Sequence, residues 1–327
     1  MRLLTKKFML LITLLLGVLL LHQTTQASGT TPQTVRVGDN GFRLEGAMVN
    51  GNPAVAYFEN TSGAKAVKYM RANDALGSSW PAPITVAANN SPVWGMDVSM
   101  AVIAGNPAIV FSDRVNQTLS YVRANDADGT SWGTPTVIFS SLEVRSLELL
   151  EVDGRPAVAY KSSNSLYFVR ATDATGTGWA ATPTLVVGGI VSITHLDMVL
   201  VNARPAIAFA FGGTNVWELG YIRADDAQGS TWPAGYVVVD NTADRTGEYL
   251  SMAVVNGKPA MAYNWRVNSV SETLRYVQAT DADGTAWGTP VNVESGSDSS
   301  STLANATSLA VIDGYPAIAY EGNKRSD

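Results

Sequence analysis

Residues 121–135 read YVRANDADGTSWGTP, and this stretch recurs along the chain with few substitutions. Each copy contains an aspartate, a glycine three residues later and a tryptophan three residues after the glycine. Each is preceded by a proline that is followed by alanine, two apolar residues and an aromatic residue. The repeat prolines are Pro53, Pro107, Pro156, Pro205, Pro259 and, at the chain end, Pro316. The tryptophans are Trp80, Trp132, Trp179, Trp232 and Trp287. The unit of repetition is therefore about 50 residues long.

Each unit contains four short segments typical of β-strands. In the second copy these are VSMAVIA (98–104), PAIVF (107–111), LSYVRA (119–124) and PTVIF (135–139), which show period-2 alternation or β-branched apolar runs. An Asn-Gly or Asp-Gly pair stands before most repeat prolines and supplies the positive φ angles of a two-residue hairpin. Since no helical periodicity is sustained, the sequence predicts an all-β, six-bladed β-propeller with four-stranded blades.

The predicted domain organisation follows from the repeat boundaries. Residues 28–327 are expected to form a single propeller domain. Its repeats are expected at 42–88, 96–140, 145–188, 194–240, 248–294 and 305–327. Residues 32–39 resemble a fourth strand without its first three, and 305–327 supply a first and a second strand. Joined, they form a composite sixth blade that protects exposed strand edges. That blade lacks a third strand, so either it is three-stranded or the chain is a fragment of a longer array.

The aspartates of the repeated hairpin are expected to be structural. Such a side chain accepts hydrogen bonds from the backbone amides of its own turn, and the glycine takes a conformation that other residues resist. The tryptophan then covers the blade edge and fills the gap to the neighbouring blade. The turn aspartates are Asp74, Asp126, Asp173, Asp226 and Asp281.

This hairpin resembles the Asp-box, or BNR, repeat of sialidase-like propellers, whose pattern is Ser-x-Asp-x-Gly-x-Thr-Trp. The spacing differs, because Asp126 lies three residues before Gly129 rather than two and the leading serine is missing. The copies are more similar to YVRATDANGTSWGTP repeats of uncharacterised exported bacterial proteins. The resemblance covers all five copies and implies a propeller, without implying a particular chemistry.

The N-terminus is typical of a secretory signal peptide. Arg2, Lys6 and Lys7 precede an apolar run, 8–21, and a polar stretch that ends at Ala27. The run has 14 residues, whereas a membrane-spanning helix needs about 20. We therefore expect 1–27 to be cleaved, leaving no membrane span and a secreted or cell-surface protein. An uncleaved anchor is the alternative.

Composition excludes several classes of site. There is no cysteine, hence no disulfide, thiolate metal site or cysteine nucleophile. The net charge of −6 becomes −9 once Arg2, Lys6 and Lys7 are removed, which disfavours nucleic-acid binding. His195 is the sole histidine after the signal, so a zinc site built on several histidines is excluded.

No metal site or cofactor is expected. The DADG sequences that begin at Asp126 and Asp281 are similar to calcium loops, where alternate carboxylates face one ion. In the other copies Leu76, Thr175 and Gln228 replace the second aspartate. Calcium therefore remains only an alternative.

Function is expected on the face where the copies differ. The connections between second and third strands, and between blades, vary in length and chemistry, and the opposite face is nearly constant. Aromatic and arginine side chains on the variable face suit binding of a sugar or a protein. The predicted ligand-binding residues, at the channel mouth and in these loops, are Arg43, Trp94, Asp97, Arg145, His195, Arg245, Glu248, Tyr249, Trp265 and Arg266.

The leading interpretation is a monomeric, non-catalytic binding module for a glycan or a protein, with no catalytic residue assigned. The alternative is a sialidase-like glycoside hydrolase or a polysaccharide lyase that works with Glu248, Tyr249 and arginines. The Arg-Ile-Pro-like motif found early in sialidases is absent. A third possibility is an architectural module of a larger surface assembly.

Overall fold

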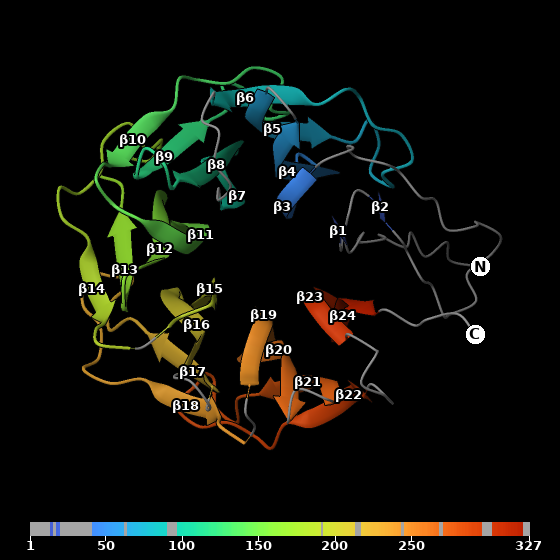
Figure 1. The fold of residues 1–327 in the computed structure, drawn as a ribbon, viewed down its shortest axis with the longest axis vertical. Coiled ribbons are helices and arrows are strands. Elements are labelled where there is room, and N and C mark those ends of the chain that lie inside the picture. Colours follow the sequence, from blue (N-terminus) through green and yellow to red (C-terminus); the bar gives the residue numbers. More distant parts are fainter. Residues whose placement is uncertain are drawn as a thin grey trace, which may run out of the picture.

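The computed structural model describes residues 14–15, 18–19, 41–61, 64–89, 97–190, 192–212, 217–242, 245–267, 271–295 and 303–322. Within these residues the regular elements are strands, and no helix is present. The antiparallel sheets are arranged in a ring around a central axis, with the first strand of each sheet innermost (Figure 1). The predicted all-β propeller is therefore confirmed.

Five sheets have four strands each, paired in chain order. Blade 1 consists of β3 (Gly41–Val49), β4 (Asn52–Thr61), β5 (Ala64–Arg71) and β6 (Ile84–Asn89). Blade 2 consists of β7 (Val98–Ile103), β8 (Asn106–Asp113), β9 (Thr118–Arg123) and β10 (Thr136–Phe139). Blade 3 consists of β11 (Val144–Val152), β12 (Arg155–Ser162), β13 (Ser165–Arg170) and β14 (Thr184–Val187).

Blades 4 and 5 continue the ring. Blade 4 consists of β15 (His195–Val201), β16 (Arg204–Gly212), β17 (Trp217–Arg223) and β18 (Val237–Asp240). Blade 5 consists of β19 (Arg245–Val255), β20 (Lys258–Val267), β21 (Ser271–Gln278) and β22 (Val291–Ser295).

The sixth sheet, blade 6, has two strands in the described part of the chain, β23 (Leu303–Ile312) and β24 (Tyr315–Gly322). Residues 32–39, predicted to complete it, lie outside the described residues. Two short strands, β1 (Leu14–Leu15) and β2 (Val18–Leu19), pair within the predicted signal peptide. The assignment of 1–27 as a signal and the predicted domain boundaries stay predictions.

The blades pack through faces of unequal side-chain size. Ala54 and Ala56 of blade 1 lie in one buried cluster with Ile109 and Phe111 of blade 2. The same relation joins blades 2 and 3, 3 and 4, 4 and 5, and 5 and 6. Small side chains allow the sheets to approach closely, so each blade boundary is a dry core.

The hairpin between the first and second strands has positive φ at both central residues, as predicted from Asn-Gly and Asp-Gly. In blade 1 these are Asn50 (φ 43°) and Gly51 (φ 80°). In blade 4 they are Asn202 (φ 49°) and Ala203 (φ 61°). Ala203 therefore adopts a left-handed backbone conformation that is strained for any residue other than glycine.

The turn aspartates accept hydrogen bonds within their own turns. Asp126 accepts hydrogen bonds from the backbone amides of Asp128, Thr130 and Ser131 at 2.9–3.0 Å. These bonds lower the pKa of Asp126, and the equivalent bonds lower that of the other four. The Trp132 indole N–H bonds to the Gly129 carbonyl at 2.8 Å. The turn is thus closed by side chains.

Candidate active site

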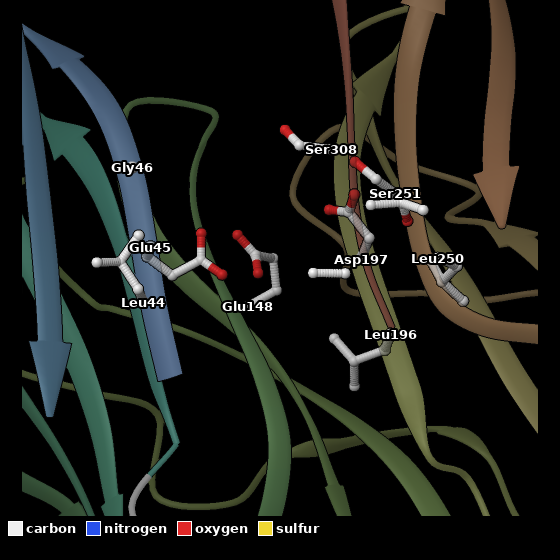
Figure 2. A pocket seen from close by; sticks show the side chains of 11 residues that line it. Leu44, Glu45, Gly46, Glu148, Leu196, Asp197, Leu250, Ser251 and Ser308 are labelled. Atoms are coloured by element: carbon white, nitrogen blue, oxygen red, sulfur yellow. The ribbon is translucent and has the colours of Figure 1, made fainter. Parts of the chain in front are cut away.

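A cavity of about 210 Å³ lies between the innermost strands. Blades 1, 3, 4, 5 and 6 contribute side chains to it, and Figure 2 shows how these face one another. The lining residues are Leu44, Glu45, Gly46, Glu148, Leu196, Asp197, Leu250, Ser251, Ala306, Thr307 and Ser308. The cavity is therefore built by segments far apart in the sequence.

Five of its polar lining residues occupy an equivalent position in their blades, eight residues before the repeat proline. We term this the axial position. Blades 1, 3 and 4 place a carboxylate there, and blades 2, 5 and 6 a serine. The axial residues are Glu45, Ser99, Glu148, Asp197, Ser251 and Ser308. Three acids from three innermost strands thus meet in the centre of the ring; we term them the acid cluster.

Several axial side chains also join neighbouring blades. The Ser99 hydroxyl accepts a hydrogen bond of 3.0 Å from the backbone amide of Leu149 in blade 3. Asp197 Oδ2 accepts one of 2.7 Å from the amide of Met252 in blade 5. Ser251 accepts one of 3.0 Å from the amide of Leu309 in blade 6. The first strands are therefore held in register with each other across blade boundaries.

The carboxyl groups of Glu45 and Glu148 point toward one another across the cavity, and Asp197 lies on the far side beside Ser251 (Figure 2). The Ser99 hydroxyl donates to Glu148 Oε1 at 3.0 Å. Asp197 Oδ1 accepts a second backbone bond, from its neighbour Met198, at 2.7 Å. The aspartate is thus surrounded by donors that favour its charged form.

Burial and mutual repulsion shift these groups. Burial, assisted by the charge of Asp197, raises the pKa of Glu45 to about 8. Burial and the charges of Glu45 and Asp197 raise the pKa of Glu148 well above its usual value. Burial also raises the pKa of Asp197, but hydrogen bonds from Met252, Met198 and Ser251 oppose it. At neutral pH the glutamate pair therefore retains a proton, and Asp197 is the acid best suited to ionise.

The remaining lining is apolar or small. Leu44, Leu196 and Leu250 border the cavity, but their side chains pack mainly into the cores of the blades. No arginine, lysine or histidine is among the lining residues within the described part of the chain. A small pocket in which several polar groups converge is typical of a binding or active site. A protonated carboxyl facing an ionised one is the arrangement used for general acid–base chemistry.

No group of three or more His, Asp or Glu side chains in the described residues is arranged to hold a metal ion. Whether the chain needs a cofactor stays a prediction. Nor does any helix in the described ranges have the length and apolar character needed to cross a bilayer.

One predicted ligand residue, Asp97, links blades 2 and 3. Its carboxylate accepts a hydrogen bond from the Arg114 guanidinium at 3.0 Å and another from the backbone amide of Ser146 at 3.2 Å. Ser146 has a φ of 52° and lies where the pairing of β11 with β12 shifts register. Asp97 is buried, so its role here is to hold this bulge.

Two predicted residues, His195 and Tyr249, are brought together across blades 4 and 5. Their ring centroids are 4.7 Å apart. Tyr249 has a φ of 51° and lies in another register shift, and its carbonyl oxygen accepts a hydrogen bond from Thr307. Both residues stand two positions before the axial ones, Asp197 and Ser251.

Trp265 and Arg266 contact residues of blade 5 and of the connection that follows blade 4. The guanidinium of Arg275 lies 3.7 Å from the centre of the Trp265 ring, and the indole N–H bonds to Thr242 at 3.2 Å. Arg266 forms an ion pair with Glu272 at 3.2 Å and lies 3.9 Å from Glu248. One face of the Trp265 ring is therefore already covered.

The remaining predicted residues either lie apart from the cavity or fall outside the part of the chain that the structure describes. Arg145 is exposed and pairs with Glu143 at 2.6 Å. Arg43 and Arg245 lie in β3 and β19, and their side chains are outside the described set. Trp94 is outside the described residues.

The acid cluster is what the sequence-based interpretation missed. The signal was present, because aligning the copies on their prolines gives a polar residue at every axial position. Several of the predicted ligand residues instead occupy the position two residues earlier, where the chemistry varies more from copy to copy.

Comparisons with known proteins support the fold. No family model matches the chain, and no curated protein matches it. A solved structure described as NanB plus optactamide superposes with a TM-score of 0.61 at 10% identity, covering 86% of this chain and 64% of that one. This chain thus spans less than two thirds of the NanB chain.

Two further structures match over most of the chain. A mutant of AofleA from Arthrobotrys oligospora, in which arginines are replaced by alanine, has a TM-score of 0.53 at 14% identity, covering 84% of this chain and 77% of that one. An exo-β-1,3-galactanase from Phanerochaete chrysosporium, solved with β-1,3-galactotriose, has a TM-score of 0.50 at 12% identity, covering 86% and 67%. At these identities the similarity shows the fold alone.

These findings correct the prediction of a non-catalytic binding module. The matching structures include an exo-β-1,3-galactanase, and the convergent acids of the axial cavity fit the hydrolase alternative better than the binding module. The prediction was drawn to exposed loop aromatics and arginines, several of which the structure pairs with their neighbours. It placed Asp97 and Glu248 at the channel mouth but did not consider the acids at the axial position, where burial changes their protonation.

Proposed function

We propose that this protein is a glycoside hydrolase whose reaction takes place in the axial cavity. The observation that carries the proposal is the acid cluster: three carboxyl groups from three blades face one small cavity, and their surroundings separate their protonation states. Hydrolysis of a glycosidic bond requires a carboxylic acid on one side of the bond and a carboxylate on the other. The recurrence of glycoside hydrolases among the matching folds agrees with this assignment.

In this proposal the Glu45–Glu148 pair supplies the proton. Two carboxyl groups that face each other in a buried site do not both ionise, so one proton remains on the pair at neutral pH. That proton passes to the leaving-group oxygen as the glycosidic bond breaks. Because the pKa of Glu45 is raised to about 8, this acid stays protonated at neutral pH.

Asp197 supplies the carboxylate. Its two backbone hydrogen bonds, from Met198 and Met252, fix its orientation and favour its ionised form. It stands on the opposite side of the cavity from the glutamate pair (Figure 2). From there it assists attack at the anomeric carbon, directly or through a water molecule.

The test is hydrolysis of a panel of aryl glycosides by the purified protein and by the variants Glu45→Gln, Glu148→Gln and Asp197→Asn. Loss of a general acid or base costs about 10²- to 10⁴-fold in rate. The matched control is Glu143→Gln, because Glu143 is an exposed glutamate outside the cavity. If the wild type hydrolyses no glycoside, or if the cavity variants behave like the control, the proposal is wrong.

Substrates with different leaving groups distinguish the residue that acts as the acid from the residue that acts as the carboxylate. A 2,4-dinitrophenolate departs without protonation, so loss of the acid should slow such a substrate much less than a phenyl glycoside. Loss of the carboxylate should slow both. We therefore expect at least one glutamate variant to retain activity on the dinitrophenyl substrate, and Asp197→Asn to lose activity on both.

A further inference from the structure

We infer that the sugar residue held in the axial cavity carries no acidic group, so that the enzyme acts on neutral glycosides and rejects sialosides and uronides. This inference rests on the proposed function, whose substrate class it names. It is carried by the composition of the cavity wall: three acids, three leucines and three hydroxyl residues, with no cation among the described lining residues.

The hydrogen-bonding character of the wall is the first argument. A carboxylate accepts hydrogen bonds and donates none, and a carboxyl group that retains its proton donates only one. Groups on the ligand that face Glu45, Glu148 and Asp197 must therefore be mainly donors. The hydroxyl groups of a neutral sugar meet this demand, whereas a ligand carboxylate offers only acceptors.

The charge around the cavity is the second argument. A fourth carboxylate beside the acid cluster would add like-charge repulsion in a partly enclosed site. Three arginines from the same ends of the blades already face acids of the protein and are not among the lining residues: Arg114 pairs with Asp97, Arg145 with Glu143, and Arg266 with Glu272.

The shape of the cavity is the third argument. At about 210 Å³ it is smaller than pockets for drug-sized ligands, which measure about 300–1,000 Å³, so it suits a single sugar ring. The small residues Gly46 and Ala306 on its lining leave room for such a ring beside the acids.

The experiment compares substrates that differ only in charge. Values of kcat/KM are measured for 4-nitrophenyl glucoside against glucuronide and galactoside against galacturonide, with a 4-nitrophenyl sialoside as a third probe. We expect at least one neutral glycoside to exceed its matched uronide by about 100-fold or more. A uronide or sialoside turned over as well as, or better than, the neutral substrates would overturn the inference.

Variants test whether the preference for neutral over acidic substrates depends on the residues of the cavity. Asp197→Asn removes the carboxylate that is ionised at neutral pH, so the ratio of neutral to acidic turnover should fall even where both rates fall. Glu143→Gln should leave the ratio unchanged. An unchanged ratio in Asp197→Asn, or loss of uronide turnover in Arg43→Ala, would show that selectivity comes from elsewhere and would overturn the inference.

Binding measurements keep the inference distinct from the proposed function. If no glycoside is hydrolysed, the hydrolase proposal fails, but saturation-transfer NMR with methyl glucoside, methyl galactoside and glucuronate still reports the charge preference. Binding of a neutral glycoside that is weakened in Glu148→Gln, without binding of glucuronate, supports the inference. Equal or tighter binding of glucuronate, or binding of neither class, overturns it.

Discussion

The hydroxyl of Tyr69 in blade 1 donates a hydrogen bond of 3.0 Å to the backbone carbonyl of Asp128 in blade 2. Its ring lies 5.0 Å from the Trp132 ring in an edge-to-face arrangement. Tyr221 of blade 4 bonds to the carbonyl of Asp283 in blade 5 in the same way. The most repeated turn of the sequence is therefore also a joint between blades.

Gly129 should tolerate no side chain. Its φ is 73°, and an added Cβ would lie 2.5 Å from Tyr69 Cε1. We expect Gly129→Ala to lower the free energy of unfolding by about 2–4 kcal/mol, combining backbone strain with steric overlap. The control is Gly51→Ala, where φ is 80° but nothing lies within 4 Å, with an expected loss of about 1 kcal/mol. Equal losses in urea denaturation would show that the joint contributes little.

Ala203 offers the opposite test. It has a φ of 61° at the position where most blades have glycine. Replacing it by glycine should stabilise the protein by about 1 kcal/mol, because relief of left-handed strain exceeds the entropy cost of glycine. The reciprocal change Gly257→Ala, at a φ of 75°, should destabilise it. A fall in melting temperature for Ala203→Gly would contradict this reasoning.

The turn aspartates should contribute to stability through their amide bonds. Asp226 accepts hydrogen bonds from the amides of Gln228, Ser230 and Thr231 at 2.8–3.0 Å. We expect Asp226→Ala to cost about 1 kcal/mol, since exposed amides recover part of the loss from water. The neighbouring Asp225→Ala removes the same charge without these bonds and serves as the control in thermal melts. Identical melting temperatures would mean that the turn does not need its aspartate.

Stability should decrease on both sides of a mildly acidic optimum. Glu45 has a folded pKa of about 8 against an ordinary 4.5, so its contribution is fully present below pH 4.5 and is lost as pH rises toward 8. Asp281, with a pKa lowered from 3.8 to about 2, contributes above pH 3.8 and loses that contribution as pH falls toward 2. Because Asp281 is exposed, the loss of stability at acidic pH should be small.

We therefore expect the highest melting temperature at about pH 4–5. Glu45→Gln should flatten the decrease between pH 5 and 8, while Glu143→Gln should preserve it. A melting temperature that rises steadily to pH 8 in the wild type would indicate that the acid cluster is not repulsive.

Catalytic activity should depend on pH through the same groups. Turnover requires a proton on the Glu45–Glu148 pair, so kcat/KM should fall as pH rises through about 8. At low pH it should fall as Asp197 becomes protonated. With a dinitrophenyl glycoside the alkaline decrease should weaken, because that leaving group needs no proton. An alkaline decrease of equal depth for both substrates would assign that limb to a different group.

The fold could be predicted because its signals are local and repeated. An Asn-Gly pair before a proline and an Asp-Ala-x-Gly turn each determine a hairpin without reference to distant residues, and the repeat length then fixes the architecture. The site could not be predicted in the same way. Glu45, Glu148 and Asp197 belong to different blades, so their approach and burial exist only once the ring has formed.

Register and cross-strand pairing also concealed the site. Bulges at Ser146 and Tyr249 interrupt the alternation of side chains just before the axial residues Glu148 and Ser251, so a count back from the proline does not show how the predicted ligand residues at that point are oriented. The sequence identifies Trp265 as an aromatic residue, but it does not show that the Arg275 guanidinium on the next strand lies over the indole ring. A pattern read along one strand contains no information about such a neighbour.

The axial position has a consequence for engineering. Five of the six axial side chains line the cavity, each from an equivalent point on the innermost strand of its blade, so much of the cavity chemistry is encoded at five codons. A combinatorial library at these codons would explore new reactions or specificities while leaving the loops untouched. Asp197 and Ser251 would be the positions to keep polar, and the buried Ser99 would be left unchanged, because each of these three accepts a bond from the following blade.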